Sequence, residues 1–165
     1  MACQFCIVGI KTHRRLDAIK NTGLKLIVPI NFPEAPDVST PEKEIDVNLK
    51  DLRHWDFAPE NPLRLSDAKI EFALTTATLK NTDDFLKNIR LAVKRGLPAD
   101  KAIAALTIVP AQWLKMSHLL GTVEAGKIAN FIITDGDVFS DKTKILETYV
   151  AGKHYEITPL PSLTA

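Results

Sequence analysis

The amino-acid sequence predicts an α/β protein in which a parallel sheet comes first and a smaller sheet follows. Two apolar runs, 4–10 and 24–30, have the length and β-branched content of strands buried on both faces. The segment between them keeps helical spacing, so strand, helix and strand form a parallel unit. A third strand pattern covers 69–76, and further short strand patterns return only after Gly121.

The composition is that of an ordinary globular chain. Its 165 residues are 45% hydrophobic and 25% charged, which suits one domain or one domain with a small appendage. A formal net charge of +1 gives no electrostatic basis for binding nucleic acid or an anionic membrane. No apolar run reaches membrane-spanning length and no signal-peptide pattern opens the chain. We expect a soluble chain whose localisation is unknown.

Cys3 and Cys6 form a Cys-x-x-Cys pair near the start of the chain. A structural zinc site needs four ligands, and no second pair follows at the required spacing. A redox pair normally sits at the N-terminus of a helix, whereas these cysteines lie in a predicted strand. We therefore interpret them as small apolar residues of that strand.

Proline and glycine mark the predicted boundaries of the first half of the chain. A helix starts near Thr12, a candidate N-cap, and ends at Gly23. The segment 32–67 is a long, proline-rich excursion in which 49–57 could form one short helix, limited by Pro59. This excursion connects strand ends on the face where α/β folds place their ligands.

After the third strand, the same signals predict three helices in succession. Thr82 or Asp83 caps a helix with an apolar stripe that ends before Gly96. A second helix begins near Pro98, and Pro110 breaks it and starts a third.

The C-terminal part is expected to be a small sheet. Turns at Gly121 and Gly126 precede a strand over 128–133, and strands over 145–150 and 153–157 form a hairpin. The remaining residues read as a loose tail.

Three consecutive segments carry a family resemblance. They are DDFLKNIRLAVKRGLPADKAIAALTIVPAQWLKM, LGTVEAGKIANFIITDGDVF and ILETYVAGKHYEI. This succession resembles the C-terminal portion of amidohydrolase-superfamily proteins, the metal-dependent hydrolases that include imidazolonepropionases and dihydroorotases. Pro110-Ala111, Gly121-Thr122 and Gly126-Lys127 occupy motif positions, while Asn130 stands where the family usually has aspartate.

The resemblance implies the last three βα units of a TIM-type (β/α)8 barrel, followed by the C-terminal strands of a small β-sandwich. A barrel of this type needs about 250 residues, so we expect an incomplete barrel from this chain alone. Residues 1–120 would form the barrel segment, with the long loop at 32–67. Residues 121–157 would form the small composite sheet, and 158–165 the tail.

The resemblance also implies a divalent metal, commonly zinc, whose ligands this chain lacks. The family's site uses a His-x-His pair, further histidines and an aspartate that ends the eighth strand. No His-x-His is present, and the corresponding strand end reads FALTTATL, without a carboxylate until Asp83. The four histidines, which we interpret as surface or packing residues, are His13, His54, His118 and His154. We therefore predict no metal ligand, no catalytic residue and no cofactor in this chain.

Two groups of residues remain as candidate ligand contacts. Thr75, Thr76 and Thr78 would sit at the mouth of the barrel, where they could hydrogen-bond a ligand or serve only as β-branched strand-end residues. His54, in the run Arg53-His54-Trp55-Asp56, is a candidate lid residue on a loop over that mouth, or part of a surface His–Asp pair.

Two functions follow. The first is the C-terminal part of an enzyme that hydrolyses C–N bonds, for example in cyclic amides, inactive without a complementing N-terminal barrel portion. The alternative is a non-catalytic, barrel-derived module that self-associates or acts as a scaffold, because open sheet edges must be paired. That module predicts a homo-oligomer. The substrate is not identified, since family specificity lies in barrel loops outside this segment.

Overall fold

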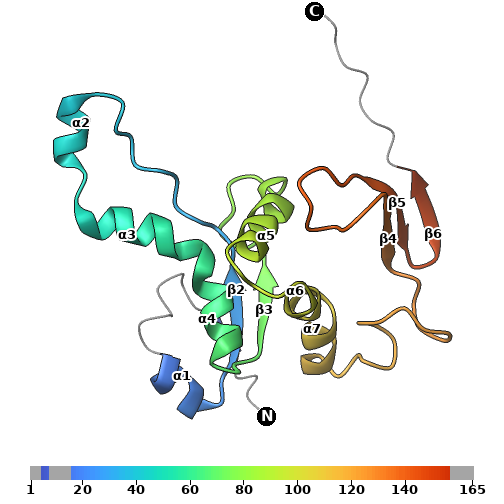
Figure 1. Ribbon diagram of the computed structural model, residues 1–165. Helices are drawn as coiled ribbons and strands as arrows, with labels where there is room; N and C mark the ends of the chain where they lie inside the picture. Colours follow the sequence, from blue (N-terminus) through green and yellow to red (C-terminus); the bar gives the residue numbers. More distant parts are fainter. Residues whose placement is uncertain (1–4, 8–15, 157–165) are drawn as a thin grey trace, which may run out of the picture.

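The computed structural model describes residues 5–7 and 16–156, which form two three-stranded sheets and the helices around them (Figure 1). In the first sheet, β1 (Phe5–Ile7), β2 (Lys25–Pro29) and β3 (Phe72–Thr75) are parallel and lie in chain order. The predicted parallel strands are confirmed. Cys3, Thr12 and His13, for which roles were predicted above, lie outside the described residues.

The second sheet is antiparallel and contains β4 (Phe131–Thr134), β5 (Ile145–Val150) and β6 (Lys153–Glu156). The predicted hairpin is confirmed, with positive φ at Ala151 and Gly152 in its turn. The predicted strand over 128–133 begins later, at Phe131. The backbone of Ile128 bonds instead to Leu119 and Asn130, so this residue belongs to a turn and not to the sheet.

The main core lies between the first sheet and α4 (Asn61–Asp67), α5 (Asp84–Lys94) and α6 (Ala99–Leu106). Short α1 (Leu16–Thr22) packs at its margin and ends before Gly23, as predicted. Burying one aliphatic side chain contributes about 1.5–3 kcal/mol, so this cluster is the main source of stability. Its buried members are Leu26, Val28, Ile30, Leu65, Phe72, Ile89, Ala92, Leu97, Ala102, Ala105 and Phe139.

The excursion after β2 is largely helical, which corrects the prediction of a long loop over 32–67. The helix expected over 49–57 is α3 (Leu49–Phe57), with the predicted bounds. It is preceded by α2 (Pro41–Asp46) and continues through the 3-10 helix η2 (Ala58–Glu60) into α4. Pro41, Pro59 and Pro62 each stand in the first turn of one of these helical segments, where the missing N–H costs no hydrogen bond.

The boundary between α6 and the next helix also differs from the prediction. Helix α6 ends at Leu106, before Pro110, because Thr107 leaves helical geometry with φ −127° and ψ −69°. Helix α7 (Ile108–Trp113) then starts ahead of Pro110 and carries it in its first turn. Asp83 occupies the N-cap position of α5, as one of the two predicted caps, but its side chain makes no capping hydrogen bond.

The segment between β4 and β5 joins the second sheet to the helical layer. Arg90 of α5 donates from Nε to the carbonyl of Val138, at 3.0 Å, and from Nη2 to the carbonyl of Thr143, at 2.9 Å. Phe139, only 8% exposed, belongs to the main core. In Figure 1 the second sheet accordingly stands beside the helices. None of the helices in the described ranges is long and apolar enough to cross a membrane.

Candidate functional site

The carboxyl ends of β2 and β3 meet at one edge of the parallel sheet, which is where such sheets bind ligands. Strand β2 runs into Asn31, and β3 ends at Thr75. A turn follows, closed by a 3.1 Å hydrogen bond from the Leu79 amide to the Thr76 carbonyl. The three predicted threonines therefore lie at or just beyond the end of β3, and we call this region the strand-end site.

Two asparagines that the sequence analysis missed hold the strand-end site in place. Asn31 donates from Nδ2 to the carbonyl of Thr78 at 2.8 Å, which links the ends of β2 and β3. Asn88 of α5 donates from Nδ2 to the carbonyl of Ile30 at 2.7 Å. Both amides thus satisfy backbone carbonyls at the edge of the sheet. The one feature of the sequence that could have indicated these residues is the position of Asn31 directly after the predicted strand 24–30.

The threonines have different surroundings. Thr75 is half-buried, and its hydroxyl accepts a 3.1 Å hydrogen bond from the amide of Ala77. Thr76 and Thr78 are exposed, and no hydrogen bond of their hydroxyls occurs among the described residues. Each can both donate to and accept from a ligand.

The backbone of the turn is strained at Thr78. Its φ of 71° lies in the left-handed region, which a β-branched residue rarely adopts. Such strain costs on the order of 1–3 kcal/mol and persists only where the surroundings impose it. The hydrogen bond from Asn31 to the Thr78 carbonyl is part of that constraint.

His54 lies in α3, the helix that was expected over 49–57, and therefore on a helix and not on an open loop over the mouth. Residues two apart on a helix do not face each other, and the carboxylate of Asp56 instead lies 2.8 Å from Nη2 of Arg95. No hydrogen bond joins His54 to the three threonines within the described part of the chain. The role of His54 as a lid residue stays a prediction.

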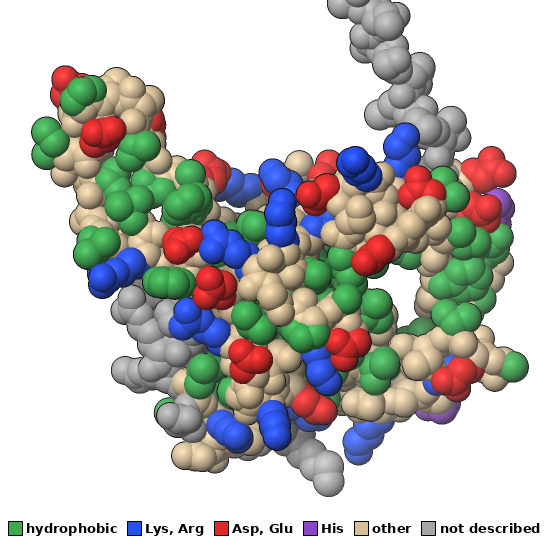
Figure 2. All heavy atoms as spheres, in the orientation of Figure 1, with side chains coloured by type: hydrophobic (Ala, Val, Ile, Leu, Met, Phe, Trp, Pro, Cys, Tyr) green, Lys and Arg blue, Asp and Glu red, His purple; other side chains and the backbone are tan. Residues whose placement is uncertain are grey.

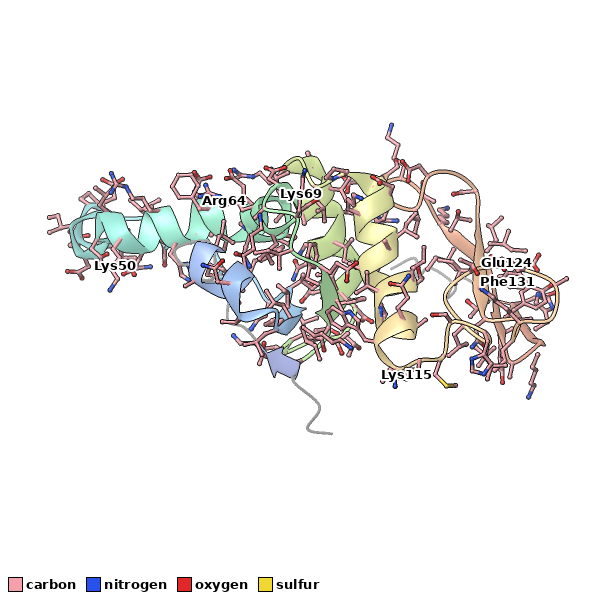
Figure 3. All side chains as sticks on the ribbon, turned by 90° about the horizontal axis from the view of Figure 1, so that it is seen from below. Lys50, Arg64, Lys69, Lys115, Glu124 and Phe131 are labelled. Carbon is pink, nitrogen blue, oxygen red and sulfur yellow. The ribbon has the colours of Figure 1, made fainter. Side chains whose placement is uncertain are left out.

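An ion network fixes the base of α3 to α5. Arg95 lies 2.8 Å from Asp56 and 3.6 Å from Glu60, and Glu60 also lies 3.0 Å from Arg64. Figure 3 shows Arg64 at this end of the long helical segment. Because these side chains are half-exposed, their ion pairs contribute little to the free energy of unfolding. We attribute to them the orientation of α3 relative to α5.

The residues at the strand-end site do not fit the zinc ion that the family resemblance implies. They offer threonine hydroxyls and asparagine amides, whereas zinc is bound by histidine, cysteine and carboxylate groups. The three described histidines lie in separate segments: His54 in α3, His118 in a turn before Gly121 and His154 in β6. Among residues 5–7 and 16–156, no group of three His, Cys, Asp or Glu side chains could hold a metal ion.

A separate polar cluster connects β5 and β6. The hydroxyl of Tyr149 donates to Oε2 of Glu147 at 3.1 Å, and Nε2 of His154 lies 2.9 Å from the same oxygen. The ring of Tyr149 stacks between Phe131 and His154, at centroid distances of 4.5 and 4.8 Å. The hydrogen bond to Glu147 raises the pKa of Tyr149 above its usual value, with smaller contributions from desolvation and from the charge of Glu147.

The described residues form a mixed α/β protein in which a small antiparallel sheet accompanies the parallel sheet. The sequence matches the model of the Amidohydrolase family over residues 60–155. The match covers more than half of the chain, and the chain belongs to this family. The sequence-based resemblance is confirmed.

Two curated proteins match shorter stretches. N-acetylglucosamine-6-phosphate deacetylase from Danio rerio is 40% identical over 58 residues, which are 35% of this chain and 13% of that protein. Adenine deaminase 2 from Jannaschia sp. (strain CCS1) is 34% identical over 71 residues, which are 39% of this chain and 11% of that protein. The matched region is thus a small part of each relative's length.

Solved structures share the fold over most of the chain. An amidohydrolase from Thermotoga maritima superimposes with a TM-score of 0.67 at 16% identity, covering 92% of this chain and 37% of that one. A prolidase in complex with N-methylphosphonate-L-proline gives a TM-score of 0.59 at 14% identity, covering 88% and 38%. The chain therefore has a mixed α/β fold similar to amidohydrolase structures and spans well under half of their length.

Proposed function

We propose that this chain is the C-terminal part of an amidohydrolase-family enzyme that hydrolyses C–N bonds. The observation that carries the proposal is the family match over residues 60–155, on a fold similar to solved amidohydrolases. The curated relatives are a deacetylase and a deaminase. Removing an acetyl group from nitrogen, or an amino group from carbon, breaks a C–N bond with water.

The proposal includes the expected domain organisation. Strands β1, β2 and β3 would be the last three of a (β/α)8 barrel, within residues 1–120. Residues 121–157 would form the small composite sheet, and 158–165 the tail. The other strands would come from a complementing N-terminal barrel portion, on a longer chain or on a partner.

Within such an enzyme, this chain would bind the substrate and leave activation of water to the other portion. Thr76 and Thr78 would hydrogen-bond the substrate, and Thr75 and Asn31 would keep the turn in shape. A threonine hydroxyl without an adjacent base does not activate water, so the isolated chain would be inactive. The divalent metal of the family would be held by the complementing portion.

The test uses the isolated chain. Its zinc content would be measured by mass spectrometry after dialysis, and its turnover with N-acetylglucosamine 6-phosphate, adenine and a Xaa-Pro dipeptide. We expect less than stoichiometric metal and no turnover. Stoichiometric bound metal together with turnover would show that the site is complete and would overturn the proposal. Reading the coding DNA upstream of Met1 for an in-frame His-x-His segment tests the complementing portion independently.

A second candidate is a non-catalytic module that self-associates or acts as a scaffold. It is favoured by one observation: β1 and β3 are the outer strands of the first sheet, and outer strands present backbone groups that another chain can pair with. Light scattering over a range of concentrations tests this function. A well-folded protein that stays monomeric throughout would count against it.

A further inference from the structure

The segment between β4 and β5, residues 135–144, begins with the one Asp-Gly sequence of the chain, Asp135-Gly136. We call this segment the β4–β5 loop. In Figure 1 it stands beside α5, and Figure 2 shows Lys, Arg, Asp and Glu side chains gathered on it, at the upper right of that view. Its outer side is therefore charged and needs no apolar cover. The exposed charged residues of the loop are Asp135, Asp137, Asp141, Lys142 and Lys144.

An Asp-Gly sequence can change covalently without an enzyme. Glycine has no Cβ, so its amide nitrogen can approach the side chain of the preceding residue. The Gly136 nitrogen attacks Cγ of the protonated Asp135 carboxyl group, and the amide proton and the carboxyl hydroxyl leave as water. The resulting five-membered succinimide then takes up water again. Breaking the bond from nitrogen to the main-chain carbonyl carbon of Asp135 gives isoaspartate, whereas breaking the bond to Cγ returns aspartate.

Hydrogen bonds hold the reacting groups in the folded chain. The carboxylate of Asp135 accepts at Oδ1 from the Lys144 amide at 2.8 Å, and the Asp135 amide donates to the Lys144 carbonyl at 3.2 Å. The hydroxyl of Thr134 donates to the carbonyl of Gly136 at 2.7 Å. Within the described part of the chain, the Gly136 amide itself makes no hydrogen bond. The reaction therefore requires a local opening that frees the Asp135 carboxylate from Lys144.

Arg90 of α5 restrains that opening. Its guanidinium donates to the carbonyls of Val138 and Thr143, so it holds both arms of the loop against the helix. Between these two residues, Phe139 is 8% exposed and belongs to the main core. A loop fixed in this way opens rarely, so the folded chain should react more slowly than the unfolded chain.

We propose that Asp135 is a site of spontaneous isomerisation to isoaspartate, and that opening of the β4–β5 loop sets the rate. Isoaspartate lengthens the main chain by a methylene group and carries its carboxylate directly on Cα. It therefore no longer places an oxygen at the Lys144 amide, which loosens the junction between the second sheet and α5. This inference goes beyond both functions proposed above, because the loop belongs neither to the strand-end site nor to the first sheet.

The first test follows the purified chain at neutral pH over several weeks, in the folded state and unfolded in urea. Mass spectrometry of proteolytic peptides with electron-transfer fragmentation locates isoaspartate. Asp137 is the matched internal control, because it lies in the same loop but precedes Val138, whose branched Cβ hinders attack. We expect isoaspartate to accumulate at Asp135 several-fold faster than at Asp137, and faster in urea than in the folded chain.

Gly136→Ala tests the role of the glycine. The added Cβ would meet the Thr143 hydroxyl at 3.1 Å, where a side-chain rotation accommodates it. We expect this variant to lower the rate at Asp135 to that at Asp137. Equal rates at the two aspartates in the wild-type chain would overturn the proposal. So would a folded chain that forms no isoaspartate at Asp135 while the urea sample does.

Arg90→Lys tests the control of the rate by the loop. We expect this variant to isomerise at Asp135 several-fold faster than the wild-type chain, toward the rate in urea. Lys87→Ala, on the same helix, is the control and should leave the rate unchanged. In the isoaspartate form, separated by chromatography, the Lys144 amide should exchange hydrogen faster. Circular dichroism checks that both variants fold, and an unchanged rate in Arg90→Lys would show that the loop does not control isomerisation.

Discussion

At the scale of single residues, Gly121 is constrained twice, by its backbone and by its neighbours. Its φ is 103°, and a Cβ would lie 3.0 Å from Cβ of Ala111 and 3.4 Å from Cα of Ile108. Gly126 has a similar φ of 89°, but nothing lies within 4 Å of its Cβ position. We expect Gly126→Ala to lower the free energy of unfolding by about 1–2 kcal/mol, and Gly121→Ala by about 1–3 kcal/mol more. Urea unfolding measures both, and equal losses would mean that α7 relaxes away from Gly121.

Thr78 should respond to substitution in the opposite direction. Glycine adopts its φ of 71° without strain, so Thr78→Gly should raise the free energy of unfolding by about 1 kcal/mol. Thr76→Gly, in the same turn but without a positive φ, should lower it. Urea unfolding of the two variants makes the comparison. A loss of stability in both would show that the turn imposes no strain on Thr78.

Some of these residue-scale features could be predicted from the sequence, and others could not. The turn at Gly121 was predictable, because glycine is the residue that adopts positive φ readily. The approach of Ala111 to it was not, since the two belong to different elements. The hydrogen-bond partners of Asn31 and Asn88 could not be predicted either, because their amides bond to carbonyls far along the chain.

At the scale of elements, the hairpin of β5 and β6 contains a group that responds to pH. The pKa of Tyr149 is raised, so the protonated phenol is favoured in the folded state up to a higher pH than in the unfolded one. The contribution of the Tyr149 hydroxyl to the stability of the folded state is fully present below pH 10.0. It is lost as the pH rises through the higher pKa that Tyr149 has in the folded state. We expect the stability difference between the wild-type chain and Tyr149→Phe to narrow above about pH 10. Urea unfolding from pH 8 to 11 tests this, and a constant difference would contradict it.

The strands and most helices were predictable because their patterns are local. Strand β2 and helix α3 each show a local pattern in the sequence. The predicted bounds of β2 differ from the observed ones by one residue at each end, and those of α3 agree with the observed bounds. The helices α2 and α4 were missed because prolines were taken as breaks. In the structure they stand in first turns, which only the neighbouring segments reveal.

At the scale of the whole molecule, the two sheets are unequally supported. The main core draws on β2 and β3 together with α4, α5 and α6, while β4 and β5 keep exposed apolar residues such as Ile132, 46% exposed, and Val150, 52% exposed. The sequence predicted both sheets but not this difference, which depends on tertiary contacts.

Arg90 is the main polar connection from α5 to the segment before β5, and its removal should release the second sheet selectively. Its guanidinium donates to two carbonyls at once, a geometry that lysine does not reproduce. We expect Arg90→Lys to speed amide hydrogen exchange in β5 about tenfold or more, and to leave β2 nearly unchanged. Lys87→Ala on the same helix, which removes an exposed pair at 3.7 Å, is the matched control and should change neither sheet. Equal acceleration in β2 and β5 would mean that the sheets open as one unit and that Arg90 serves the stability of the whole fold.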